Sequence, residues 1–236
     1  EKGIEKGGIY SVLPVVGRTG IVLIILFLFA SFIDIYKPKV LHQVKHVLLL
    51  ALVFFIVSLM TYVLRILDAS PHLIPVAMGA MIFAFVHDVR IGFAGAAVLG
   101  VLTGSLWGND FLVMFIAFLA GVVGVLSTRH VRSRSRIVHT IMLLALTYVV
   151  TIVLSGFLRY ESFREMLKPV SFGALNGLLT PIITFGLLPL IELAFDVTTD
   201  FSLLELSNLN HPLLKKLSYE ASGTYHHSLN VGNLAE

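Results

Sequence analysis

Two adjacent histidines near the end of the chain, His226 and His227, have the side chains best suited to metal chemistry. A neutral imidazole is a common ligand of divalent metal ions. The pattern predicts a helix that follows Thr224 and runs to the end of the chain, with the two histidines about 100° apart on it. A metal site needs several further ligands, so the spacing by itself favours exposed helical histidines over a metal site.

A second group of residues, Asn176, Gly177, Thr180 and Pro181, interrupts an apolar stretch that covers residues 170–191. Asn176 is the one amide in that stretch, and a polar residue within a membrane usually faces protein or a cavity. Pro181 removes a backbone hydrogen bond and permits a kink. These residues predict either an intramembrane pocket and hinge or a structural kink with a fully bonded Asn176, and we favour the kink.

Small residues recur at every fourth position of a third stretch: Gly92, Ala96, Gly100, Gly104 and Gly108. Such a face lets two helices approach closely in lipid, where packing replaces the hydrophobic effect. We interpret it as a packing face inside a helical bundle, with a homodimer interface as the alternative.

Ionisable residues stand at the ends of the apolar stretches rather than inside them. A transporter or proton pump should carry such residues well within its spans, paired with one another. The pair His87-Asp88 lies in a short turn between two apolar stretches, where it is better explained as a helix cap than as a metal site. The pattern therefore favours an anchor or sensor over a transporter.

The composition indicates which elements must position these residues. The chain has 236 residues, of which 57% are hydrophobic and 13% charged, and its mean hydropathy is +0.92. Soluble domains carry about 25% charged residues, so this composition excludes most soluble folds and predicts an integral membrane protein. The absence of cysteine excludes disulfides, cysteine zinc sites and thiol nucleophiles. The basic run at 129–136 is better explained as a cytoplasmic loop than as a nucleic-acid site.

Seven apolar stretches separate cleanly along the chain. They cover residues 19–33, 47–64, 73–86, 91–109, 111–128, 137–158 and 170–191. A membrane-spanning helix needs about 20 mostly apolar residues, and an open strand cannot satisfy its backbone in lipid. The stretch 73–86 is the weakest, with Pro75 near its start, and is either a short tilted span or a re-entrant segment. The sequence predicts an all-α integral membrane fold: a seven-helix transmembrane bundle with a short cytoplasmic helical extension.

The positive charges set the predicted orientation. With the N-terminus outside, ten of the 17 Lys and Arg residues fall on the inner side, including those of the two densest short loops. We therefore expect an outer N-terminus and a cytoplasmic C-terminus. The predicted divisions are an extracytoplasmic juxtamembrane segment 1–18, the bundle 19–195, a linker with a connecting helix 196–223, and a final helix 224–236.

Three stretches resemble those of a known family. The first is Leu-Ile-Pro-Val-Ala-Met-Gly-Ala-Met at 73–81, and the second is Leu-Asn-Gly-Leu-Leu at 175–179 with Gly-Leu-Leu-Pro-Leu-Ile-Glu at 186–192. The third runs through Thr-Thr-Asp at 198–200, Leu-Leu-Glu-Leu at 203–206, Asn-His-Pro-Leu-Leu at 210–214 and Gly-Thr-Tyr-His-His-Ser-Leu at 223–229, and this last string is the most specific. The chain resembles bacterial seven-transmembrane proteins with a cytoplasmic HD hydrolase domain, and it is similar to the membrane-bound cyclic di-AMP phosphodiesterases. The resemblance extends over residues 19–236.

The resemblance implies a large extracellular domain before the first helix and an HD domain after the last. It also implies two divalent metal ions, iron or manganese, in the full-length protein. His227, with His226 as the runner-up, becomes the first metal ligand, and residues 224–236 become the first helix of a truncated HD domain. The remaining ligands are not in the chain. Because metal-assisted hydrolysis needs ions held by several ligands, we expect these residues alone to bind no metal and to be catalytically silent.

The function implied by the resemblance is a transmembrane sensor and anchor that couples a signal to hydrolysis of cyclic di-AMP in the cytoplasm. The implied location is the bacterial plasma membrane. The expected partners are the lipid bilayer, cyclic di-AMP in the full-length protein, an unidentified extracellular or lipid ligand, and a second copy in a homodimer, with no nucleic acid. The alternatives are a small-molecule transporter or permease and a passive membrane dimerisation module.

Overall fold

The computed structural model describes residues 9–128, 134–199, 202–203 and 212–235, and every regular element in these ranges is helical. The chain divides into two compact units, Glu1–Val197 and Thr198–Glu236. The first unit contains α1 (Ile9–Tyr36), α2 (Val44–Ile66), α3 (Val76–Val86), α4 (Val89–Leu106), α5 (Phe111–Thr128), α6 (Arg134–Leu158) and α7 (Phe163–Phe195). The short 3₁₀ helices η1 (Pro38–Val40) and η2 (Pro71–Leu73) precede α2 and α3, respectively. The second unit contains α9 (Pro212–Glu220) and α10 (Ser222–Ala235).

The prediction of an all-helical membrane bundle is confirmed. Within the described residues, six helices are long and apolar enough to cross a membrane: α1, α2, α4, α5, α6 and α7. The seventh, α3, has 11 residues and a length of about 16 Å, roughly half of the hydrocarbon core of a bilayer. Helix α3 begins at Val76 rather than at the start of the predicted stretch 73–86, because Ile74 is extended (ψ 123°), as residues before proline usually are.

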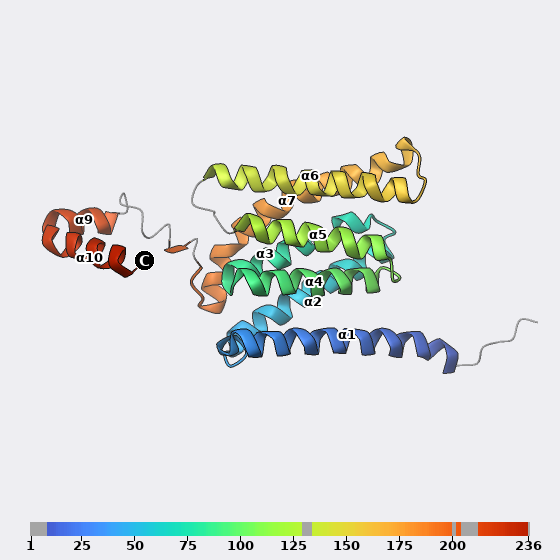
Figure 1. The fold of residues 1–236 in the computed structure, drawn as a ribbon, viewed down its shortest axis with the longest axis horizontal. Coiled ribbons are helices and arrows are strands. Elements are labelled where there is room, and N and C mark those ends of the chain that lie inside the picture. The colour runs from blue at the N-terminus through green and yellow to red at the C-terminus, as the bar shows by residue number, and fades with distance from the viewer. Residues whose placement is uncertain (1–8, 129–133, 200–201, 204–211, 236) are drawn as a thin grey trace, which may run out of the picture. The chain divides into compact units, whose positions relative to one another are not determined.

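Helix α3 forms the centre of the bundle. Helices α1, α4, α5 and α6 lie along one common direction, with α1 on one flank and α6 on the opposite flank, and α7 crosses behind them at a slant (Figure 1). Helix α3 packs against α2, α4, α5 and α7, and most of its side chains are buried. Close packing requires small residues here: a Cβ added at Gly79 would lie 2.8 Å from Leu99 Cδ1. A short helix can therefore be accommodated because protein, not lipid, surrounds it.

The outer helices carry large apolar side chains that face away from the protein. Phe27 on α1 is 70% exposed, Phe55 on α2 is 62% exposed and Met142 on α6 is 66% exposed. Apolar surface of this extent indicates contact with lipid rather than water. Helix α1 begins at Ile9, so residues 9–18 of the predicted juxtamembrane segment belong to this first helix.

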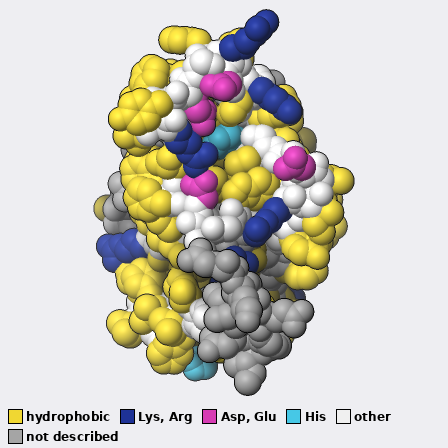
Figure 2. Space-filling model, turned by 90° about the vertical axis from the view of Figure 1, so that its right-hand side faces the viewer, with side chains coloured by type: hydrophobic (Ala, Val, Ile, Leu, Met, Phe, Trp, Pro, Cys, Tyr) yellow, Lys and Arg dark blue, Asp and Glu magenta, His cyan; other side chains and the backbone are white. Residues whose placement is uncertain are grey.

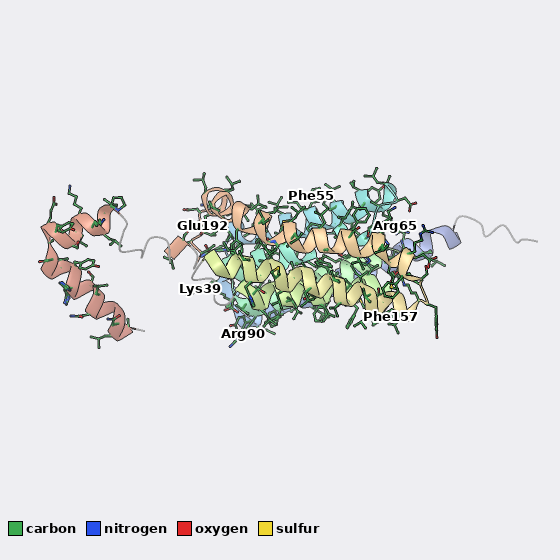
Figure 3. The ribbon with its side chains drawn as sticks, turned by 90° about the horizontal axis from the view of Figure 1, so that it is seen from above. Lys39, Phe55, Arg65, Arg90, Phe157 and Glu192 are labelled. Atoms are coloured by element: carbon green, nitrogen blue, oxygen red, sulfur yellow. The ribbon has the colours of Figure 1, made fainter. Side chains whose placement is uncertain are left out.

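Charged side chains lie at the two ends of the first unit. Figure 3 shows Lys39, Arg90 and Glu192 at one end of the bundle and Arg65 at the other. The Arg65 guanidinium donates a hydrogen bond to the Leu106 carbonyl oxygen and so joins the ends of α2 and α4. Long basic side chains at helix ends reach the polar interface of a membrane without burying their charge.

The small-residue face of α4 lies inside the bundle. An added Cβ would contact α3 at Gly92 and α5 at Gly100 and Gly104, and Ala96 is fully buried. Gly108 lies beyond the end of α4, in the turn to α5, with a φ of +93° that L residues rarely adopt. The first four residues therefore pack against helices of their own chain.

Replacing Gly177 with Ala should destabilise the bundle by about 1–3 kcal/mol, because overpacking against a backbone cannot be relieved by a side-chain rotation. An added Cβ would lie 2.5 Å from the Ala145 Cα and 2.6 Å from the Ala145 nitrogen on α6. Thermal unfolding in detergent measures the effect. Gly186→Ala on the same helix is the control, since nothing lies within 4 Å of its added Cβ. Equal losses in both variants would contradict this account of α6–α7 packing.

Candidate functional site: a polar pocket beside an interrupted helix

A pocket of about 190 Å³ lies at the end of the first unit where α4 turns into α5 and α6 into α7. The lining residues are Ser70, Pro71, His72, Trp107, Asp110, Leu112, Val113, Ile116, Ile152, Ser155, Arg159, Glu161 and Pro169. Figure 2 shows this end of the bundle, where acidic and basic side chains gather among hydrophobic ones. In the orientation predicted from the sequence, this end is extracytoplasmic.

An ion pair forms one wall of the pocket. Arg159 Nη2 donates to Asp110 Oδ2 at 2.6 Å, with the two side chains 45% and 27% exposed. Asp110 Oδ1 accepts the amide N–H groups of Leu112 and Val113 at 2.9 and 3.2 Å, which caps α5. Burial raises the pKa of the Asp110 carboxyl, but these N–H groups and the Arg159 guanidinium outweigh it and hold the pKa below its ordinary value. Asp110 is therefore a carboxylate that fixes the position of Arg159.

Three further side chains give the pocket its polarity. Glu161 is half-buried and forms no ion pair with any residue that the structure describes. Trp107 contributes an indole and His72 an imidazole, which is mostly neutral at pH 7. The charged lining therefore consists of two carboxylates and one guanidinium, with a net charge of about −1.

Beside the pocket, Asn176 holds the interrupted segment before α3. Its Nδ2 lies 2.7 Å from the carbonyl oxygen of His72, 3.0 Å from that of Ile74 and 3.1 Å from Tyr148 Oη. Its Oδ1 accepts the hydroxyl of Thr180 at 2.7 Å. Non-helical backbone at membrane depth is tolerated only where its polar groups are bonded. The Asn176 amide therefore supplies the N–H donors that a continuous helix would supply.

Of the four polar and kink residues predicted on α7, the structure joins two by a side-chain hydrogen bond. Asn176 and Thr180 share a hydrogen bond, Gly177 packs against Ala145, and Pro181 is buried. Helix α7 remains continuous from Phe163 to Phe195 through all of them. The interruption lies before α3 instead, and Asn176 borders the pocket through His72 without lining it.

The histidines of the tail lie apart from this pocket in sequence and are exposed. His226 and His227 belong to α10, and the Tyr225 ring packs edge-on against His226 with centroids 5.6 Å apart. Across the described residues, no group of three or more His, Asp or Glu side chains is placed to hold a metal ion. Helix α10 begins at Ser222, so Thr224 lies inside the helix, whereas the sequence predicted a helix that starts after Thr224.

The His87-Asp88 turn caps α4. Asp88 Oδ1 accepts the Arg90 N–H at 2.7 Å. The His87 ring is buried edge-on against the His46 ring, with centroids 5.0 Å apart. Burial, and next the neighbouring His46, lower the pKa of His87 to about 4, which keeps it neutral.

Sequence reasoning did not identify the pocket. Its charged residues, Asp110, Arg159 and Glu161, look in the sequence like ordinary ends of spans. One signal was available: the predicted topology places all three in connections on the same side of the membrane. That signal does not show which connections meet, because neighbouring helices in a bundle need not be consecutive in sequence.

Replacing Asn176 with Leu should cost about 1–3 kcal/mol of stability, because the part-buried His72 carbonyl and the buried Ile74 carbonyl lose a donor. Thr184→Val is the matched control, because its hydroxyl bonds the Thr180 carbonyl one turn back on the same helix, at 2.7 Å. We expect the control to unfold close to the wild-type temperature in detergent. If both variants unfold together, Asn176 does not hold the interrupted segment.

Asp110→Asn should remove an acid-sensitive part of the stability while keeping the cap on α5. A lowered pKa means that the carboxylate stabilises the fold above its ordinary pKa, and that this stabilisation is lost as the pH falls through the folded-state value. Unfolding temperatures measured from about pH 7 to about pH 3 should fall more steeply for the wild type than for the variant. Asp110→Ala should be about 1 kcal/mol less stable than Asp110→Asn, because alanine also removes the cap on α5. Parallel acid profiles for wild type and Asp110→Asn would refute this role.

Comparison with known proteins places nearly all of the bundle in one family. The family described as a 7TM receptor with intracellular HD hydrolase matches residues 12–199. The chain is 33% identical over 175 residues to the cyclic-di-AMP phosphodiesterase PgpH of Bacillus subtilis (strain 168), covering 70% of the chain and 24% of the relative. It is 28% identical over 210 residues to PgpH of Listeria monocytogenes serotype 1/2a (strain 10403S), covering 85% of the chain and 29% of the relative.

A third relative, the uncharacterised protein slr0104 of Synechocystis sp., is 42% identical over 74 residues, or 31% of the chain and 9% of the relative. No solved structure matches the chain. The chain spans about a quarter of the length of the two phosphodiesterases. Because the family match covers nearly all of the helical bundle described above, the chain belongs to the 7TM receptors with an intracellular HD hydrolase.

Proposed function

We propose that this chain is the membrane region of a cyclic di-AMP phosphodiesterase and that it couples a signal on the outer side of the bacterial plasma membrane to hydrolysis in the cytoplasm. Two of its relatives carry the name of that activity. The proposed orientation has the N-terminus outside and the C-terminus inside. It is supported by the excess of Lys and Arg in the loops on the proposed inner side.

In this proposal, the hydrolysis belongs to an HD domain that this chain only begins. Two divalent metal ions, iron or manganese, would supply an activated water and a clamp for the phosphate oxygens. His227, with His226 as the runner-up, fits the first ligand position, since both imidazoles are exposed on α10 and free to meet ligands from outside the described residues. One or two imidazoles cannot hold a two-metal centre, so the chain alone is expected to be inactive.

The observation that carries the proposed coupling is the continuity of α7. This helix has 33 residues and a length of about 50 Å. Pro169 near its start lines the pocket, and Asn176 holds the segment before α3. Asp196, at its other end, pairs with Lys45 at the start of α2 at 3.0 Å. One continuous helix therefore joins the pocket to the point where the chain leaves the bundle.

The exposed pair Lys45–Asp196 is a weak contact, with side chains 58% and 84% exposed. A weak contact at the end of α7 is suited to a joint that moves, because little free energy is lost when it opens. A shift of α7 caused at the pocket can then reach the cytoplasmic segment. Coupling between two sites requires two states that the signal distinguishes, and α7 held or released at Lys45 supplies such a pair of states.

The coupling is tested by a covalent link at this joint. The chain has no cysteine, so Lys45→Cys with Asp196→Cys in an otherwise cysteine-free full-length protein offers one pair of thiols. Linking the pair with a short bismaleimide should change the rate of cyclic di-AMP hydrolysis in nanodiscs by about fivefold or more. The control is the same protein treated with a monofunctional maleimide, which carries the same two substitutions and thiol adducts without the link.

An unchanged rate after complete linking would refute coupling through α7. His227→Ala should abolish hydrolysis in the linked and unlinked proteins alike, and full activity in that variant would refute the assignment of the metal ligand. The transporter alternative predicts flux of a solute into sealed liposomes without any cyclic di-AMP hydrolysis. The passive dimerisation alternative predicts hydrolysis that the link leaves unchanged.

A further inference from the structure

We infer that the pocket at the outer end of the bundle binds a small zwitterion with a carboxylate and an ammonium group, of the free α-amino acid class. This inference deepens the proposed function, since a ligand in the pocket is the form that the signal would take. It rests on the arrangement of one guanidinium, one carboxylate that forms no ion pair with a described residue, and an apolar wall around a pocket of about 190 Å³.

Arg159 supplies the site for the carboxylate of the ligand. Its contact with Asp110 uses Nη2, whereas a guanidinium carries five N–H donors. The Asp110 carboxylate is already engaged by two amide N–H groups and by Arg159, so its function is to orient the guanidinium. The Arg159 side chain remains 45% exposed, which leaves donors accessible for a second, charge-assisted pair.

Glu161 supplies the site for the ammonium group. It lies two residues after Arg159 in the same turn, lines the same pocket and forms no ion pair with any described residue. A half-buried carboxylate without a cationic partner attracts a cation more strongly than an exposed one, because water screens it less. The net charge of about −1 disfavours a simple anion, and the free donors on Arg159 favour a ligand that carries both charges.

The remainder of the lining indicates the size of the ligand and the nature of its side chain. Ile116 and Ile152 are 3% and 2% exposed and form an apolar inner wall with Leu112 and Val113. Trp107 adds an aromatic face that suits either an aliphatic group or an ammonium. The volume lies below the about 300–1,000 Å³ of sites for drug-sized ligands. A free amino acid with a small or medium apolar side chain fits the apolar wall, the aromatic ring of Trp107 and the small volume.

The decisive experiment measures binding without reference to hydrolysis. The full-length protein in nanodiscs is dialysed against each radiolabelled proteinogenic amino acid, and any that binds is compared with its decarboxylated amine and its N-acetyl derivative. We expect saturable binding of at least one amino acid, and binding about tenfold or more weaker for both derivatives, because each lacks one of the two charges. Failure of every amino acid to bind, or equal binding of the amine, would overturn the inference.

Two variants and a control locate the site. Glu161→Gln and Arg159→Lys should each weaken binding about tenfold. Glu161→Gln removes the negative charge that pairs with the ammonium, and Arg159→Lys removes the planar guanidinium that can bind the carboxylate through two N–H groups. Lys168→Gln, an exposed charge near the start of α7 that does not line the pocket, should leave binding unchanged. Unfolding temperatures near wild type confirm that each variant is folded. Unchanged binding in Glu161→Gln would place the ligand elsewhere and overturn the assignment.

The two proposals can fail separately. Binding that requires Glu161 and Arg159 but leaves cyclic di-AMP hydrolysis unchanged supports the pocket and refutes the coupling. No binding, with hydrolysis that still responds to the link at α7, refutes the ligand class and leaves the coupling intact.

Discussion

The arrangement of the bundle depends on one side-chain amide that replaces backbone donors. The chain between α2 and α3 cannot be helical at Ile74 and Pro75, yet it lies among the helices, where an unbonded carbonyl is costly. Asn176 on α7 donates to the carbonyls of His72 and Ile74. This bond, across about a hundred residues of sequence, permits a short buried α3 instead of a seventh full-length helix.

The interruption has consequences for the rest of the first unit. Because α3 starts deep in the bundle, the residues that would have extended it form η2 and leave room for a pocket between the α4–α5 and α6–α7 turns. Asp110 and Arg159 meet across that room, 49 residues apart in sequence. Helix α7 is then in contact with both features, through Pro169 in the pocket lining and through Asn176. The pocket, the interruption and the longest helix thus form one connected arrangement.

Part of the site was predictable from residue types, and part was not. The isolated amide in an apolar stretch identified Asn176 as a residue that must find partners, and the favoured interpretation was a bonded amide rather than a ligand site. The identity of those partners was not predictable, because every residue has a backbone carbonyl and the sequence does not show which ones lack a donor. The charges of the pocket looked like ordinary span ends, since Asp110 belongs to one short connection and Arg159 and Glu161 to another. The residue types drew attention to the tail histidines, but the prediction that His227 is a metal ligand came only from the family resemblance, and both histidines lie in the second unit.

The sequence by itself determined that this protein is helical, that it belongs in a membrane, and approximately where its helices run. These properties follow from local composition, because the free energy of transferring a segment to lipid is summed over neighbouring residues. Only the tertiary structure decided that α3 is short and enclosed, that Asn176 closes the gap before it, and that Asp110, Arg159 and Glu161 share one pocket. These properties depend on which helices lie side by side, and packing between small-residue faces such as Gly177 against Ala145 sets that arrangement.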